Sequence, residues 1–239
     1  MDKFINELED YFNWYKDIYG NTLYTSDVVD PDYHINISAG VSEAQESPAY
    51  TVASQDFSEL DAFREQIKNC TRCHLSRTRK NFVFGLGNPK SELMFIGEAP
   101  GAEEDATGIP FVGRAGKLLD KMLYAIGLKR EEIYIANVLK CRPPNNRDPQ
   151  PDEIAQCEPY LIEQIRIISP KILVALGRVS GQMLSGQNKS LGILRSGDYT
   201  YNNLPLIITY HPAALLRNPS WKANAWIDLK KIKKMLNKD

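Results

Sequence analysis

Long apolar segments are missing from this sequence of 239 residues. No stretch approaches the ~20 consecutive apolar residues that a helix needs to cross a bilayer. The first residues, MDKFINELED, lack the basic and apolar regions of a secretory signal. We therefore expect a cytoplasmic protein that does not associate with membranes. We also expect it to act as a monomer.

Basic residues are scarce at the start of the chain. Residues 1–60 hold 12 Asp and Glu but only 2 Lys and Arg, a net charge of −10, whereas residues 61–239 hold 18 and 27, a net charge of +9. A basic body suits a polyanionic partner such as DNA, because each cation that neutralises a phosphate releases condensed counterions. Scattered solubilising charge explains such an asymmetry about equally well. Charge alone therefore does not identify the partner.

Residues 1–55 form an acidic N-terminal extension, and we expect the globular domain to span residues 56–239. The extension begins with large apolar residues at helical spacing, which predicts a short helix: Phe4, Leu8, Tyr11, Phe12 and Tyr15. Residues 22–54 are polar and without period, which indicates a linker. A disordered solubilising chain, a partner-binding helix and a DNA mimic are the hypotheses for its role, and we favour the first.

Four short apolar runs alternate with amphipathic helical patterns along the domain. The runs lie at residues 93–97, 133–138, 172–177 and 206–210. Continuous apolar strands separated by helices are typical of a parallel sheet that is covered on both faces. The prediction is an α/β fold with three layers, α/β/α, around a central, mostly parallel four-stranded sheet.

Polar residues follow three of these strands directly. Glu98 comes after the first run, Asn137 lies at the end of the second, and His211 follows the fourth. In open parallel sheets, ligands bind at the carboxyl ends of the strands. A carboxylate, an amide and an imidazole are therefore expected to meet at one edge of the sheet.

Only four cysteines are present, in the order Cys70-x2-Cys73, Cys141 and Cys157. Disulfides are rare in cytoplasmic proteins, so a tight first pair and two further thiols favour a metal site. Structural zinc sites commonly use two short pairs, whereas 15 residues separate Cys141 from Cys157. This spacing modestly favours a structural 4Fe-4S cluster over zinc, and four unrelated buried cysteines are the remaining alternative.

Three motifs and the cysteine pattern together carry a family resemblance. The segments GEAPGAEEDATGIPFVGRAGKLLD, ANVLKCRPPNNRDP and HPAALLRNP closely resemble the family 4, or iron–sulfur, uracil-DNA glycosylases of the uracil-DNA glycosylase superfamily. The match covers roughly residues 60 to 235. It implies an enzyme that flips uracil out of DNA and hydrolyses the N-glycosidic bond, leaving an abasic site for base excision repair. It also implies a 4Fe-4S cluster bound by the four cysteines.

The resemblance assigns three residues to recognition of the base. Asn137 is expected to pair with one carbonyl and the ring N–H of uracil, a pattern that cytosine does not offer. Phe111 offers a flat face for the pyrimidine. Glu104 is expected to stand where the methyl group of thymine would go.

The same resemblance assigns residues to bond cleavage and to opening of the duplex. His211 is expected to stabilise the charge that develops on the uracil oxygen. Glu98 is the carboxylate nearest to Ala99, a substrate-binding position at which family 1 glycosylases carry an Asp, so Glu98 is expected to orient a water molecule. Leu215 is the expected wedge that fills the space left by the flipped base.

Two other classes of protein are compatible with parts of the sequence. A catalytically weak DNA-binding or polymerase-accessory module of the same fold is the first alternative, and the joint presence of Glu98, Asn137 and His211 argues against it. An iron–sulfur nuclease is the second, and it would need acidic metal ligands clustered on strands. The carboxylates here gather in one turn instead.

Overall fold

The computed structural model describes residues 58–236. The predicted N-terminal helix and linker lie outside the described residues. The domain boundary at residue 56 therefore stays a prediction. Within the described part of the chain, no helix is both long enough and apolar enough to cross a membrane.

A six-stranded sheet forms the middle of the molecule, with the strand order β1-β3-β2-β4-β6-β5. The strands are β1 (Leu86–Gly87), β2 (Leu93–Gly97), β3 (Tyr134–Asn137), β4 (Ile172–Leu176), β5 (Tyr199–Tyr201) and β6 (Leu204–Thr209). The four inner strands are parallel, as the sequence predicts. The two antiparallel edge strands β1 and β5 are an addition to the predicted four. At two and three residues they are too short to show a periodic pattern.

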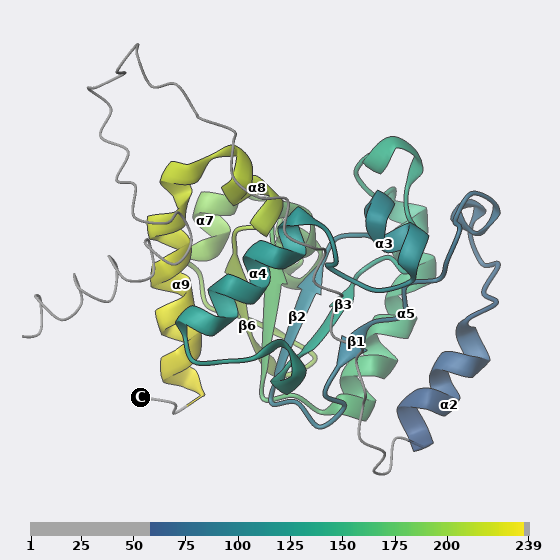
Figure 1. The fold of residues 1–239 in the computed structure, drawn as a ribbon, viewed down its shortest axis with the longest axis horizontal. Helices are drawn as coiled ribbons and strands as arrows, with labels where there is room; N and C mark the ends of the chain where they lie inside the picture. The colour runs from purple at the N-terminus through teal and green to yellow at the C-terminus, as the bar shows by residue number, and fades with distance from the viewer. Residues whose placement is uncertain (1–57, 237–239) are drawn as a thin grey trace, which may run out of the picture.

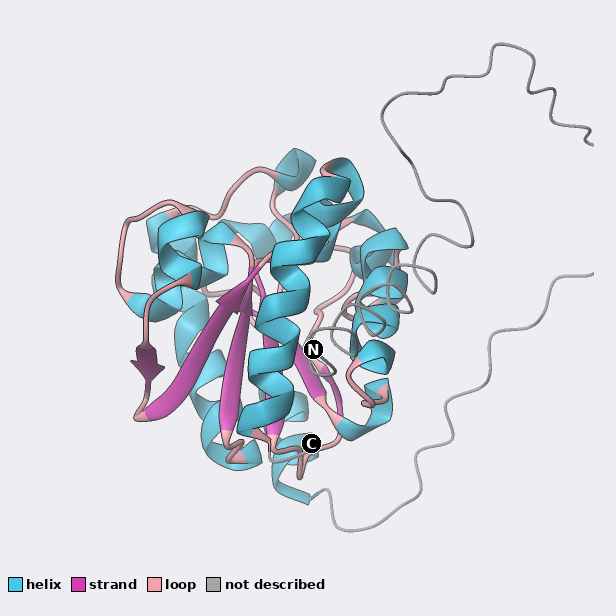
Figure 2. Cartoon of the chain, turned by 90° about the vertical axis from the view of Figure 1, so that its left-hand side faces the viewer, coloured by secondary structure: helices cyan, strands magenta, loops and turns pink. Residues whose placement is uncertain are grey.

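Helices cover both faces of the sheet, so the predicted three-layer α/β/α architecture is confirmed (Figures 1 and 2). The α-helices are α2 (Ser58–Ile67), α3 (Ala102–Thr107), α4 (Arg114–Ala125), α5 (Pro151–Ile168), α6 (Arg178–Ser185), α7 (Leu191–Arg195), α8 (Pro212–Arg217) and α9 (Lys222–Met235). Short 3-10 helices lie at η1 (His74–Arg77), η2 (Arg130–Glu132), η3 (Pro144–Asn146) and η4 (Pro219–Trp221).

Successive strand residues point to opposite sides of the sheet and enter two separate cores. Phe95 and Val174 pack with α4 and α9 on one face. Met94 and Leu173 pack with α2 and α5 on the other. Because both faces are covered, every residue of β2, β3 and β4 is buried, and the strands appear in the sequence as continuous apolar runs.

Candidate active site

A cavity of about 610 Å³ opens at the carboxyl ends of the parallel strands. Six of the predicted site residues line it: Glu98, Ala99, Glu104, Phe111, Asn137 and His211. They are brought together by the strand register, which pairs the last residue of β2, Gly97, with Asn137 of β3. The structure thus joins residues that are more than 110 positions apart in the chain. We call this cavity the strand-end cavity.

Asn137 and Phe111 are packed around a glycine. A Cβ atom on Gly97 would lie 2.3 Å from Asn137 Oδ1 and 2.7 Å from the ring of Phe111. Such distances are far inside van der Waals contact. Both side chains are also nearly completely buried. The amide and the ring therefore occupy their positions only because residue 97 has no side chain.

The loop that carries Phe111 is held in an unusual conformation. Phe111 has a φ of 53°, a left-handed value that is uncommon for a residue other than glycine. A Cβ on Gly116, in the first turn of α4, would lie 1.8 Å from the Phe111 carbonyl oxygen. The close approach of α4 therefore fixes this backbone, and Phe111 is placed against His211, with ring centroids 5.4 Å apart and 29° between the ring planes.

His211 caps helix α8 with its own side chain. The backbone N–H of Ala213 donates a hydrogen bond to His211 Nδ1 at 3.1 Å. A nitrogen that accepts carries no proton, so the neutral ring has its proton on Nε2. Burial, with a smaller effect from Arg217, lowers the pKa of His211 to about 4. At neutral pH the imidazole is therefore uncharged and presents Nε2–H as a donor.

Glu104 is fixed by backbone groups. Its carboxylate accepts hydrogen bonds from the N–H groups of Gly101 at 3.1 Å, Val112 at 3.0 Å and Gly113 at 3.2 Å. These bonds tie the start of α3 to the loop that follows Phe111. The carboxylate thus stands in the cavity wall as a rigid group and organises the loop around it.

Glu98 is partly buried where β2 leaves the sheet. Burial is the largest cause that raises its pKa, to about 7. The negative charge of Asp148 raises it further, and the positive charge of Arg178 lowers it. At neutral pH a substantial share of this carboxyl group is ionised and able to accept a proton.

The four cysteines lie on the side of the molecule formed by α2, η1, the segment 138–150 and α5, which we call the cysteine side. Cys141 and Cys157 are buried, and Cys70 and Cys73 pack against the same core. Cys141 interacts electrostatically with Cys73 and Cys70, and Cys157 with Cys141 and Cys73. Arg79 Nη1 donates to Cys141 Sγ at 3.1 Å, and the Lys140 N–H donates to Cys157 Sγ at 3.3 Å.

All four thiols are free and face one region. Among residues 58–236, however, no three His, Cys, Asp or Glu side chains come close enough to hold a single metal ion. Four free thiols with N–H···S hydrogen bonds are a donor set of the kind that iron–sulfur clusters use.

Comparison with known proteins identifies the family of this chain. The model of the "Uracil DNA glycosylase superfamily" matches residues 84–230, more than half of the chain. The chain belongs to the uracil-DNA glycosylase superfamily. It is 48% identical over 185 residues to the type-4 uracil-DNA glycosylase of Sulfurisphaera tokodaii, a match that covers 74% of this chain and 84% of that protein.

Two further type-4 uracil-DNA glycosylases show similar agreement. The protein of Archaeoglobus fulgidus is 43% identical over 187 residues, covering 75% of this chain and 94% of its own length. The protein of Thermotoga maritima is 42% identical over 184 residues, covering 75% and 96%. The resemblance to family 4 predicted from the motifs is confirmed.

One predicted site residue of this superfamily member lies elsewhere. Leu215 is completely buried in the core next to α4 and α9, so the prediction that it is the wedge is wrong. Because His211 caps α8, the helix turns Leu215 inward and leaves the next residue, Leu216, 37% exposed. A Leu-Leu pair alone does not show which of the two faces the solvent.

Four residues that shape the site were missed by the sequence analysis. Gly97 ends β2, and Gly177 follows β4. Gly177 has a φ of 97°, and a Cβ atom on it would lie 3.0 Å from His211 Cβ. Asp148 and Arg178 line the cavity and form an ion pair across 30 residues of sequence. The position of three of them at strand ends was the available signal, and Asp148 lies in the segment ANVLKCRPPNNRDP that carries the family resemblance.

Proposed function

We propose that this protein is a uracil-DNA glycosylase that hydrolyses the N-glycosidic bond of uracil in DNA and leaves an abasic site. The observation that carries the proposal is that Asn137, Phe111 and His211 line one cavity at the strand ends. The names of the type-4 relatives support the same activity. A base stacked in a duplex cannot reach such a cavity, so the nucleotide must be flipped out.

Base selection follows from the rigid surroundings of Asn137. Its amide offers a donor to a uracil carbonyl and an acceptor to the ring N3–H. Cytosine presents an acceptor and an amino donor on that edge, so the fixed amide pairs poorly with it. Phe111 supplies the stacking face. The immobile Glu104 carboxylate supports a steric wall against the methyl group of thymine.

Bond cleavage places negative charge on the departing uracil and positive charge on the sugar. In this proposal His211 donates its Nε2–H to a uracil carbonyl oxygen, and the bond strengthens as charge develops there. The neutral ring is suited to this role, because it keeps its proton on Nε2 while Nδ1 accepts the hydrogen bond from Ala213. Glu98 orients a water molecule and accepts its proton as the water attacks the sugar. Ala99 completes the wall beside it.

Opening of the duplex is assigned to the rim of the cavity. Leu216 is exposed on α8, next to the rim residue Arg217, and it takes the wedge role in place of the buried Leu215. Arg217 lines the cavity and is suited to the phosphates that flank a flipped nucleotide. Each contact of this kind would contribute to the energy that unstacking costs.

The cofactor in this proposal is a structural 4Fe-4S cluster bound by Cys70, Cys73, Cys141 and Cys157. When bound, it would cross-link the segment before η1, the loop after β3 and helix α5, and supply no chemistry to the base. The proposal also keeps a monomeric, cytoplasmic protein, as expected from the sequence. Brown colour and about four iron atoms per chain after anaerobic purification would support the cluster, whereas stoichiometric zinc would overturn it.

A uracil-bearing oligonucleotide tests the activity. The protein is incubated with the labelled strand, and abasic sites are then cleaved with alkali. We expect strand breaks with the wild type and few or none with His211→Ala or Asn137→Ala. A thymine-bearing strand of the same sequence is the control. Absence of breaks with the cluster-loaded wild type would overturn the proposed function.

A further inference from the structure

The charged side chains that line the strand-end cavity include Glu98, Asp148 and Arg178. Arg178, the first residue of α6, donates from Nη2 to Asp148 Oδ2 at 2.7 Å. Its Nη1 donates to Gln182 Oε1 at 3.0 Å. The guanidinium is thus held between an ion partner from the loop before α5 and a helical neighbour one turn away.

We propose that the Asp148–Arg178 ion pair, which lines the same cavity as Glu98, adjusts the lower pH limit of catalysis. This inference rests on the proposed role of Glu98 as the base. A nearby negative charge disfavours ionisation of a carboxyl group, and a nearby positive charge favours it. The pair therefore acts on Glu98 with two opposite influences, whose balance depends on where the pair is held. Neither residue needs to touch the substrate, so both are positioning residues.

The electrostatics of the cavity support this division of roles. Burial raises the pKa of Glu98 most, to about 7, and Asp148 and Arg178 then act in opposite directions. The remaining charged or titratable groups around the cavity are Glu104, Arg147, His211 and Arg217. Glu104 is engaged by three backbone N–H groups, and burial keeps His211 neutral.

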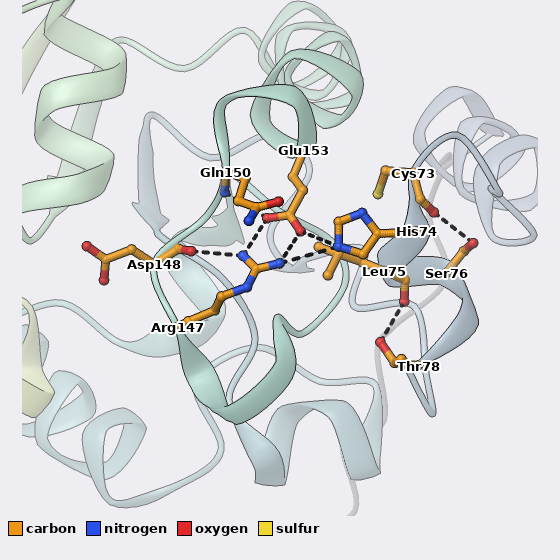
Figure 3. A network of polar contacts seen from close by, with 9 residues as sticks. All are labelled: Cys73, His74, Leu75, Ser76, Thr78, Arg147, Asp148, Gln150 and Glu153. Atoms are coloured by element: carbon orange, nitrogen blue, oxygen red, sulfur yellow. Dashed lines mark hydrogen bonds and ion pairs between the residues drawn. The ribbon is translucent and has the colours of Figure 1, made fainter.

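The loop that carries Asp148 is anchored by a buried carboxylate, as Figure 3 shows. Arg147 donates to both oxygens of Glu153, at 2.9 Å and 2.6 Å, and also to the Asp148 carbonyl oxygen at 3.0 Å. The Glu153 side chain is fully buried, and it also contacts His74 Nε2 at 2.9 Å. Arg147 is therefore neutralised on the α5 side, and it holds the backbone of Asp148, whose exposed side chain pairs with Arg178.

The first test is the pH dependence of the single-turnover rate at saturating DNA, which removes effects on binding. Asp148→Asn is expected to move the acidic limb to lower pH, and Arg178→Gln to higher pH, each by roughly half a unit to one unit. Asp148→Glu and Arg178→Lys retain the charges and should stay close to the wild type. A merely structural role would lower the rate at every pH without moving the limb.

Two exposed ion pairs provide charge-matched controls. Asp198 pairs with Lys231, and Arg166 with Glu163, and neither pair lines the cavity. Asp198→Asn and Arg166→Gln should leave the limb unchanged. If these variants move it as far as the cavity variants do, net charge rather than the ion pair is responsible, and the inference fails.

The second test observes Glu98 directly in the DNA-free protein. The side-chain carboxyl carbons of Glu are labelled with ¹³C, and the Glu98 signal is assigned by its loss in Glu98→Gln. Its titration midpoint should fall in Asp148→Asn and rise in Arg178→Gln. An unchanged midpoint, or a shift of the same sign in both variants, overturns the inference.

The two tests also separate this inference from the function on which it rests. If the midpoint moves as expected but Glu98→Gln keeps the wild-type rate and limb, the role of Glu98 as base is wrong and the electrostatic control of catalysis fails with it. If Glu98→Gln removes the limb while both ion-pair variants leave it in place, the proposed function stands and only the inference is lost.

Discussion

The strand-end cavity and the cysteine side hold their important side chains in different ways. In the cavity, Asn137, His211 and Glu104 are positioned by groups close to them. These groups are glycines without a Cβ atom, backbone N–H groups and the paired strands. On the cysteine side, long side chains join distant segments, such as Arg79 with Cys141 across 62 positions. The sheet itself preorganises the cavity, whereas the cysteine side is held by an ion network and by hydrogen bonds between distant segments.

The largest effect is expected at His211, where one side chain has two functions. Removing one preorganised donor typically lowers a rate by about 10²–10³, so His211→Ala and His211→Asn should both lose at least that much in single turnover. Asn remains a good N-cap residue, and loss of a cap costs about 1 kcal/mol. Only the Ala variant should therefore also lose stability in denaturant unfolding. A near wild-type rate for His211→Ala would contradict the donor role, because the Ala side chain has no N–H group.

A smaller but still large effect is expected from one methyl group at residue 97. Gly97→Ala pushes Asn137 and Phe111 apart, and a displacement of about 1 Å at a reacting centre can cost ~10²-fold in rate. Gly192→Ala is the matched control, because a Cβ there meets nothing within 4 Å. We expect the control to keep its activity. Equal single-turnover rates for the two variants would show that the cavity does not depend on steric fit.

The sequence predicted the inner strands and several residues of the strand-end cavity, but not the steric contacts that position them. The continuous apolar runs gave the four inner strands, and the position of Asn137 and His211 at strand ends predicted the cavity correctly. The steric role of Gly97 was not accessible, because it depends on atoms from β3 and from the loop of Phe111. The orientation of Leu215 depends on the phase of α8, which its cap determines.

The cysteine side was harder to predict, because its interactions bridge long stretches of chain. The spacing of the four cysteines marked them as a candidate metal site. Glu153, however, contacts Arg147 and also His74, which lies 79 positions earlier in the chain. No local period marks such pairs. Edge strands of two and three residues were missed for a related reason, since their pairing partners rather than their own residues define them.

The ion network of the cysteine side should show its effect in stability more than in rate. Glu153→Gln keeps the shape of the side chain but removes its charge, and charge-assisted hydrogen bonds contribute about 1.5–3 kcal/mol each. Because Arg147 is 32% exposed and can be rehydrated, we expect a loss of roughly 1–3 kcal/mol in the free energy of unfolding of the cluster-loaded protein. Glu163→Gln breaks a comparable pair with exposed Arg166 and should cost under about 1 kcal/mol. Equal losses would remove the distinction between the network and ordinary surface pairs.

The smallest effect is expected at Leu216, which precedes the cavity residue Arg217 on α8. A wedge matters only where a base must leave a stack, so Leu216→Ala should lower the rate on duplex DNA by a few-fold, corresponding to about 1 kcal/mol of lost apolar contact. On single-stranded DNA, where unstacking costs less, the change should be smaller still. Ile193→Ala removes an exposed apolar side chain from α7, outside the cavity lining, and should change neither rate. If Leu216→Ala lowers both rates equally, the side chain supports the folded rim, and filling of the vacated space must be assigned to another residue.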